Sequence, residues 1–229
     1  MNVLLLAAGL GTRLRPLTDN IPKCLVIVKN QILLDIWMKN IISNKLNLIF
    51  INTHYLHEKV EFHIKSNYKF PVNILYEPFL LGTYGTISNN IHRFINDDLL
   101  VIHADNYTRF DLNYLIEAHN HRPKTCLMTM LTFSTNSPHE CGIVELDNDN
   151  VLIDFYEKSP LIKGNIANAA IYIFSRELLQ ELALLKFQIT DIAKDLIPLY
   201  KSRIYTYHTS EIFLDIGTIE NYKIANNLN

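Results

Sequence analysis

The loop after the first apolar segment carries residues suited to binding phosphate. The run Leu4–Ala8 is followed by Gly9, Gly11, Thr12 and Arg13. Glycines let the backbone turn tightly, so that successive N–H groups can point at the oxygens of an anion. The Arg13 guanidinium adds a rigid cationic fork that matches phosphate. The loop is neither a dinucleotide-binding G-x-G-x-x-G, because position 14 is leucine, nor a Walker loop, because no Gly-Lys-Ser/Thr follows.

Two aspartates are placed to bind a metal ion. Asp105 follows the apolar run Leu99–His103, at the predicted carboxyl end of a parallel strand, where open α/β sheets place their ligands. Asp215 stands before Gly217, far along the chain. Mg²⁺ needs one or two carboxylates and takes its other ligands from phosphate oxygens and water, so two aspartates are sufficient. Each aspartate alone is equally typical of a helix or turn cap.

The elements that must position these residues follow from hydrophobic patterning. Short apolar runs separated by longer amphipathic segments predict a parallel sheet in the first half of the chain. The predicted strands are Asn2–Ala7, Leu46–Asn52, Val72–Tyr76 and Leu99–His103. The predicted helices are Ile32–Ser43, Leu56–Ile64, Thr83–Phe94 and a segment that begins near Asp111.

After residue 124 the pattern changes to strands joined by polar turns, which predicts antiparallel pairs. The predicted strands are Thr125–Phe133, Gly142–Leu146, Val151–Glu157, Ala169–Phe174 and Ile204–His208. The predicted helices are Arg176–Leu185, Thr190–Leu199 and a closing helix from Ile219. The expected fold class is α/β, a Rossmann-like three-layer α/β/α arrangement with a mixed, mostly parallel central sheet.

The composition is that of a globular protein with small-molecule partners. The chain has 229 residues, of which 48% are hydrophobic and 19% charged, and a formal net charge of -2. These values argue against disorder and against a basic surface for nucleic acid or membranes. Three cysteines without CxxC spacing are too few for a disulfide framework or a Cys₄ zinc site. We expect a single domain, 1–229, in a reducing cytoplasm.

Several blocks of the sequence together resemble the sugar-1-phosphate nucleotidyltransferases, also called nucleotide-sugar pyrophosphorylases. The first block is Gly-Leu-Gly-Thr-Arg-Leu-Arg-Pro-Leu-Thr at 9–18, followed by Ile-Pro-Lys at 21–23. Further blocks occur in the family's order at Glu77-Pro78, 81–86, 103–106, 141–144, 155–158, 168–172 and 215–218. The resemblance covers essentially the whole chain. Departures from the family's pattern, which bear on substrate detail, stand at Tyr84, Ala104, Cys24 and Ser159.

The resemblance implies a reaction in which a sugar-1-phosphate oxygen attacks the α-phosphate of a nucleoside triphosphate and releases pyrophosphate, as a supply of activated sugar for polysaccharide or glycoconjugate synthesis. Because two anions must meet, cationic side chains and a divalent metal are needed. The resemblance assigns Arg13 to the triphosphate, Lys23 to the reacting phosphates and Lys158 to the sugar phosphate. It makes Asp105 and Asp215 the ligands of Mg²⁺, with Mn²⁺ as an alternative.

The resemblance places the nucleotide at about 1–124 and the sugar at about 125–229. The nucleotide-binding residues that it implies are Ala7, Ala8, Gly9, Gly11, Thr12, Arg13, Glu77, Gly82 and Thr83. It implies backbone contact with the sugar at Gly142, a hydroxyl acceptor at Glu157 and an amide at Asn168. A carboxylate at Glu77 can accept from the N1–H and amine of guanine, which favours GTP, and UTP, dTTP and CTP stay open.

Short family members of this kind include heptose-1-phosphate and mannose-1-phosphate guanylyltransferases, with muramate-1-phosphate uridylyltransferases as relatives. A muramate- or glucose-1-phosphate enzyme that uses UTP, dTTP or CTP therefore stays open, and a homo-oligomer is compatible with the resemblance. We expect a catalytic domain without a β-helical or acyltransferase extension. Two other classes are considered. A metal-dependent glycosyltransferase would use the D-x-D at 147–149, but this sequence lies in a predicted turn. A non-catalytic nucleotide-sugar-binding subunit would be expected to lose the charged residues that this chain keeps.

Overall fold

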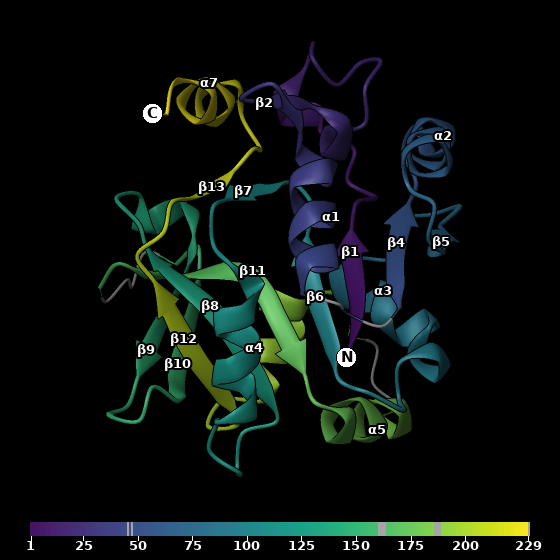
Figure 1. The fold of residues 1–229 in the computed structure, drawn as a ribbon. Coiled ribbons are helices and arrows are strands. Elements are labelled where there is room, and N and C mark those ends of the chain that lie inside the picture. Colours follow the sequence, from purple (N-terminus) through teal and green to yellow (C-terminus); the bar gives the residue numbers. More distant parts are fainter. Residues whose placement is uncertain (45, 47, 160–163, 186–188, 229) are drawn as a thin grey trace. The chain divides into compact units, whose positions relative to one another are not determined.

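The computed structural model describes residues 1–44, 46, 48–159, 164–185 and 189–228 (Figure 1). The chain forms two compact units, each built from separated segments. The first unit contains Met1–Leu80, Ile102–Phe110 and Ile212–Asn229, and the second contains Leu81–Val101 and Asp111–Glu211. Among the described residues, no helix is both long enough and apolar enough to cross a membrane.

The first unit is organised around parallel strands. β1 pairs with β4, and β4 pairs with β5, all in parallel. β1 also neighbours β6, which contributes its last residues to this unit. All five residues of β4 are buried, the apolar residues 49–51 as the pattern predicts and the polar Asn52 and Thr53 as well. The main strands and helices are β1 (Asn2–Leu6), β4 (Ile49–Thr53), β5 (Val72–Tyr76), β6 (Leu99–His103), α1 (Leu33–Ser43), α2 (His57–Asn67) and α7 (Ile219–Asn227).

Shorter elements complete the first unit. β2 and β3 form an antiparallel pair, and Figure 1 shows α7 beside β2. β7 pairs antiparallel with β13, which joins a segment just after β6 to a segment near the end of the chain. These elements are β2 (Ile27–Val28), β3 (Gln31–Ile32), β7 (Asn106–Thr108), β13 (Phe213–Asp215) and the 3₁₀ helices η1 (Thr12–Leu14) and η2 (Lys23–Leu25).

The second unit is mixed. β9 pairs antiparallel with β10 and β11, β11 pairs antiparallel with β8, and β12 runs parallel to β8. β11 also neighbours β6. Its strands are β8 (Met128–Ser134), β9 (Gly142–Leu146), β10 (Leu152–Glu157), β11 (Ile166–Phe174) and β12 (Ile204–Thr209). Its helices are α3 (Thr83–Asn89), η3 (Ile91–Arg93), α4 (Leu112–Asn120), η4 (Pro138–Glu140), α5 (Arg176–Leu184), η5 (Ile192–Leu196) and α6 (Ile197–Leu199).

The predicted α/β fold with a mixed, mostly parallel sheet is confirmed. Some boundaries differ. The helix predicted at Thr83–Phe94 breaks into α3 and η3, because the Asn90 side chain donates to the Thr86 carbonyl and competes with the helical pattern. The helix predicted at Thr190–Leu199 begins as a π-helical turn, η5. The strand predicted from Leu46 begins at Ile49, and Asn47 lies outside the described residues.

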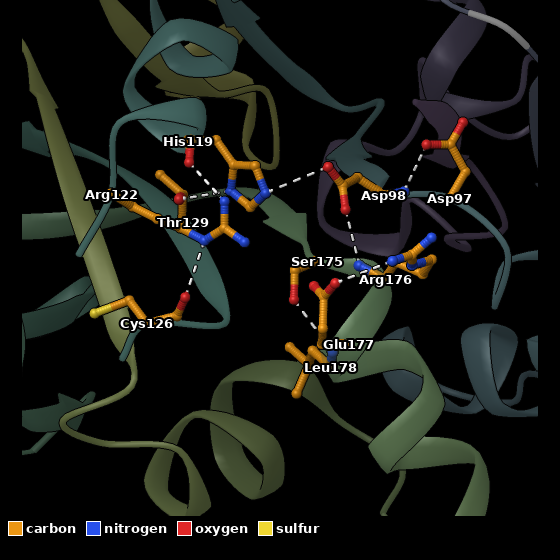
Figure 2. Close-up of polar contacts among 10 residues, drawn as sticks. All are labelled: Asp97, Asp98, His119, Arg122, Cys126, Thr129, Ser175, Arg176, Glu177 and Leu178. Carbon is orange, nitrogen blue, oxygen red and sulfur yellow. Dashed lines mark hydrogen bonds and ion pairs between the residues drawn. The ribbon is translucent and has the colours of Figure 1, made fainter. Parts of the chain in front are cut away.

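Polar contacts link residues from four elements of the second unit (Figure 2). Asp98, just before β6, accepts from the Arg176 amide at the start of α5, and its other oxygen lies 3.7 Å from Nε2 of His119. His119 contacts Thr129 of β8 through Nδ1 at 2.8 Å, and Arg122 donates to the His119 carbonyl. Burial, with the positive charge of Arg122, lowers the pKa of His119 to about 3. The imidazole is therefore neutral at pH 7.

Candidate active site

The centre of the site in the first unit is Lys23. Its side chain is 10% exposed, and Nζ lies 2.6 Å from Oδ2 of Asp105 and 3.1 Å from Oδ1 of Asp215. The partners are 82 and 192 residues away in the sequence. One cationic nitrogen thus bridges both of the predicted metal-binding carboxylates.

The β7–β13 pair brings the two aspartates together. Asp105 lies between β6 and β7, and the Ile216 amide donates to the Asp105 carbonyl at 3.0 Å. Asp215 ends β13. A Cβ on Gly217 would lie 2.7 Å from Oδ2 of Asp215 and 3.0 Å from Nη2 of Arg13. A larger residue at position 217 would therefore displace the Asp215 carboxylate or the Arg13 guanidinium. Sequence reasoning did not assign this role to Gly217.

The charges of this cluster hold one another in the ionised state. Burial lowers the pKa of Lys23, but the attraction of Asp105 and Asp215 outweighs burial, so the pKa is raised. Burial raises the pKa of Asp105, but the charge of Lys23 outweighs it, so this pKa is lowered. Burial, with the negative charge of Asp105, raises the pKa of the Cys24 thiol to about 12, so the thiol is protonated and is not a nucleophile.

Arg13 extends the cluster towards solvent. Its Nη2 lies 3.8 Å from Oδ2 of Asp215, and its side chain is 67% exposed. An exposed pair of this kind contributes little to stability. The guanidinium is therefore accessible to an anionic ligand.

The two carboxylates fit a magnesium ion. Among the described residues, no group of three or more His, Cys, Asp or Glu side chains could hold a metal. Asp105 and Asp215 nevertheless converge on a single positive charge, that of Lys23. Mg²⁺ is bound by one or two carboxylates when substrate phosphates complete its shell. Asp105 and Asp215 are the residues that would hold it.

The glycine-rich loop has one position that requires glycine. Gly11 has φ +65, and its Cβ would lie 3.0 Å from Cγ2 of Thr18, whose hydroxyl donates to the Gly11 carbonyl at 2.7 Å. This turn starts η1, which carries Thr12 and Arg13. A Cβ on Gly9 would meet nothing within 4 Å in the part of the chain that the structure describes, which gives no steric reason for that glycine.

The predicted base-binding carboxylate, Glu77, is buried rather than on the surface. It is 3% exposed, and Oε1 accepts from Nδ2 of Asn52 at 3.0 Å. Oδ1 of Asn52 accepts from the Ala7 amide at 2.6 Å. Sequence reasoning missed Asn52. The available signal was an amide side chain within an apolar strand.

In the second unit, the Gly82 loop packs against a backbone carbonyl. Gly82 has φ +82, and a Cβ there would lie 2.4 Å from the Thr190 oxygen, which accepts from the amides of Tyr84 and Gly85. The Thr83 hydroxyl accepts from the Ile192 amide at 2.8 Å. Gly82 and Thr83 thus have structural roles here, and their contact with a nucleobase stays a prediction.

Three of the predicted sugar-binding residues lie together in the second unit. A Cβ on Gly142 would lie 2.6 Å from Oε2 of Glu157 and 2.4 Å from the Phe155 ring. Nζ of Lys158 lies 4.0 Å from Oε1 of Glu157, and Lys158 has φ +48, an uncommon value for a residue with a side chain. Burial, with the charge of Asp191 adding to it, raises the pKa of Glu157, although the charge of Lys158 opposes the shift.

A bulge in β11 positions the fourth residue, Asn168. The register with β8 shifts between Asn168 and Tyr172, and Ala170 has φ +52. The Asn168 amide donates to the Tyr172 hydroxyl at 2.7 Å and its oxygen accepts from the Ala170 amide at 2.8 Å. In a regular strand, residues four apart would be separated by about 13 Å. Tyr172 could not be found from spacing, because the contact depends on the bulge.

Comparison with known proteins supports the family that the sequence indicated. The family model described as nucleotidyl transferase matches residues 2–228. Glucose-1-phosphate adenylyltransferase of Lachnospira eligens is 26% identical, and the alignment covers 99% of this chain and 59% of that protein. Mannose-1-phosphate guanylyltransferase catalytic subunit beta of Xenopus tropicalis is also 26% identical, with 95% and 61% covered. The chain thus spans about three-fifths of the length of these curated relatives.

Among solved structures, HddC from Yersinia pseudotuberculosis, complexed with GMP-PN, superposes with a TM-score of 0.80. The match covers 98% of this chain and 97% of that one at 23% sequence identity, so it shows the fold. The family model spans nearly the entire sequence and includes every residue of the Lys23 cluster. The chain therefore belongs to the nucleotidyl transferase family.

Proposed function

We propose that this protein transfers a nucleotidyl group from a nucleoside triphosphate to a sugar 1-phosphate and releases pyrophosphate. The observation that carries the proposal is the convergence of Asp105 and Asp215 on Lys23, with Arg13 beside Asp215. A buried lysine between two carboxylates, with an exposed arginine beside it, suits a reaction between two phosphates, in which positioning and charge dominate catalysis.

In the first unit, the exposure of each charged side chain indicates which phosphate it would bind. Arg13 is mostly exposed and suits the outer phosphates and the pyrophosphate leaving group. Lys23 is buried and held by two carboxylates, so it suits a fixed position next to the reacting phosphates. A Mg²⁺ ion on Asp105 and Asp215 would neutralise negative charge on phosphate oxygens and favour attack at phosphorus.

The residues of the second unit have the chemistry needed for a sugar phosphate. Glu157 offers a hydroxyl acceptor, Lys158 offers a cation, and the Asn168 amide is held in place by Tyr172. Sugars need dense polar pairing, and groups held by their own hydrogen bonds bind without losing further freedom. We assign these three residues to the sugar 1-phosphate.

We propose GTP as the preferred nucleotide. A carboxylate can accept from both the N1–H and the amine of guanine, whereas uracil and thymine present one ring N–H between two carbonyls. Glu77 is the buried carboxylate at the end of β5, in the same unit as the phosphate-binding loop. Curated relatives include guanylyl-, adenylyl- and uridylyltransferases, so membership of the family does not determine which nucleotide is preferred. The preference for GTP has to be measured.

The glycosyltransferase alternative would need Asp147 or Asp149 as a metal ligand. Oδ1 of Asp147 instead accepts from the amides of Asp149 and Val151. Such bonds are typical of an aspartate that stabilises its own turn. This geometry favours a structural role for the D-x-D.

The test is a screen of pyrophosphate release across GTP, UTP, dTTP, CTP and ATP with a panel of sugar 1-phosphates and Mg²⁺. We expect release with GTP, and none when the sugar phosphate is omitted. Activity best with UTP or dTTP would overturn the guanylyl assignment alone. Transfer of sugar from a nucleotide-sugar, without pyrophosphate, would overturn the proposed reaction.

A further inference from the structure

We propose that Asn52 is a positioning residue for the nucleobase: it holds the Ala7 amide and the Glu77 carboxylate in one fixed arrangement and thereby determines nucleotide preference. The inference rests on the function proposed above, in which both of these groups bind the nucleotide. Asn52 itself would contact neither the reacting phosphates nor the metal. No feature of the resemblance assigned it a role.

The Asn52 side chain links three neighbouring strands at their carboxyl ends. Asn52 lies near the end of β4 and is 4% exposed. Ala7 directly follows β1, and its amide donates to Oδ1 of Asn52 at 2.6 Å. Glu77 directly follows β5, and its Oε1 accepts from Nδ2 of Asn52 at 3.0 Å. The carboxyl ends of parallel strands are where α/β folds bind their ligands.

The two contacts determine which side chain can stand at position 52. The backbone amide of Ala7 can only donate, and the ionised carboxylate of Glu77 can only accept. The residue between them must therefore accept on one side and donate on the other, within a short reach. Asparagine does both. Aspartate would accept from Ala7 but place a second negative charge against Glu77, and leucine would do neither.

Glu77 is held from its backbone as well. Its amide donates to the Thr53 carbonyl at 2.8 Å, and its carbonyl contacts Nδ1 of His54, also at 2.8 Å. With the main chain held in place, the contact with Asn52 fixes the direction of the carboxylate. A hydrogen bond to a carboxylate is stronger than one between neutral groups, and here it is buried. Its loss would leave the carboxylate displaced rather than the strand unfolded.

The experiment exchanges donor and acceptor between the two positions. Asn52→Asp should raise the KM for GTP at least about tenfold and narrow the preference for GTP over UTP, with kcat at saturating nucleotide within about threefold of wild type. In the double variant Asn52→Asp/Glu77→Gln, the amide at 77 donates to the carboxylate at 52, which still accepts from Ala7. The KM of the double variant should return to within about threefold of the Glu77→Gln single variant.

Thr53→Val is the matched control. Thr53 is the next residue of β4 and fully buried, and its hydroxyl has no hydrogen-bond partner among the described residues. This change disturbs the same strand without touching the Asn52 contacts, so the KM for GTP should stay at the wild-type value. Thermal unfolding of all variants would show whether each is folded under the assay conditions.

Three outcomes would overturn the inference. These are a wild-type KM and base preference in Asn52→Asp, a double variant whose KM for GTP stays more than about threefold above that of Glu77→Gln, or an equal KM change in Thr53→Val. Failure of the proposed function is distinct, because wild-type protein would then release no pyrophosphate with any nucleotide. In that case, calorimetric titration with GTP alone still measures whether Asn52→Asp weakens binding and whether the double variant binds GTP as tightly as Glu77→Gln does.

Discussion

At the scale of single residues, the arrangement around Lys23 decides what the first unit can do. A lysine with a 10% exposed side chain would be costly without partners, and here two carboxylates balance its charge. The charge of the lysine in turn lowers the pKa of Asp105, against the effect of burial. The positions of these charged groups are thus fixed by their own contacts before any ligand binds.

Asp215→Asn should lower turnover by at least about 100-fold, because it removes a charged ligand beside the reacting phosphates. Asp19→Asn is the matched control, since both side chains are 49% exposed and both lie near an arginine, Arg13 or Arg15. Pyrophosphate release measures the effect, and Asp19→Asn should be indistinguishable from wild type. Full wild-type activity in excess EDTA would contradict the metal assignment.

Arg13→Ala should reduce turnover by at least about tenfold while the melting temperature changes little, because an exposed arginine makes few packing contacts but can orient a triphosphate. Arg15→Ala provides the comparison, since Arg15 is 56% exposed in the same loop and pairs with Asp19. Its turnover should be unchanged. If Arg13→Ala melted early yet kept its specific activity when folded, Arg13 would be structural.

At the scale of elements, short connections rather than long helices hold the site residues. The β7–β13 pair joins Asp105 to Asp215, a bulge in β11 orients Asn168, and the Thr190 carbonyl anchors the start of α3. The bulge and the start of α3 each include one residue with a positive φ, Ala170 and Gly82. A substitution at such a position can be unfavourable because the new side chain overlaps a neighbour or because the backbone is strained. The two causes can be measured separately.

Gly82→Ala should lower the free energy of unfolding by about 2 kcal/mol or more, because a methyl group would overlap the Thr190 oxygen in addition to straining the backbone. Gly164→Ala measures the backbone strain alone, without the steric overlap. Gly164 has φ +90, but a Cβ there would meet no atom of the described residues within 4 Å. Urea unfolding should therefore show a smaller loss for Gly164→Ala. Equal losses would mean that the carbonyl contact adds nothing.

At the scale of the whole molecule, stability should depend on pH through His119. Its pKa is about 3 in the folded protein, below the 6.5 of an unperturbed histidine, because burial and Arg122 disfavour the charged form. The unfolded chain therefore binds an additional proton between pH 3 and 6.5. Stability from this group is fully present above pH 6.5 and is lost as the pH falls, by at most ~1.4 kcal/mol per pH unit.

His119→Gln should remove this dependence. Asp98 and Arg122 face the imidazole from neighbouring segments and remain in the variant. Between pH 7 and pH 5, wild-type protein should lose about 2 kcal/mol more in free energy of unfolding than His119→Gln does. Urea titrations at both pH values measure the difference. Parallel losses in the two proteins would show that His119 does not carry the effect.

Local sequence determined the elements and the chemistry available to them. The apolar runs of β1, β4 and β6 predicted buried strands, because strands buried on both faces of a sheet are mostly apolar. The run of β5 predicted a strand as well, but β5 lies at the edge of the sheet and only Leu75 in it is buried. The Asp111 cap of α4 was likewise readable, since its carboxylate bonds an amide only two residues away. The ordered blocks identified the family, which the family model confirms.

Only the tertiary structure decided which groups meet. The contacts of Lys23 with Asp105 and Asp215 bridge 82 and 192 residues, and nothing in the local pattern encodes a lysine between two carboxylates. The contacts of Asn52 with Ala7 and Glu77 follow only from the pairing of β4 with β1 and β5. Tyr172 reaches Asn168 only because the strand between them is irregular. Periodicity reports which face of an element is buried, whereas hydrogen bonds between distant side chains depend on strand order, register and bulges, which arise from packing of the entire chain.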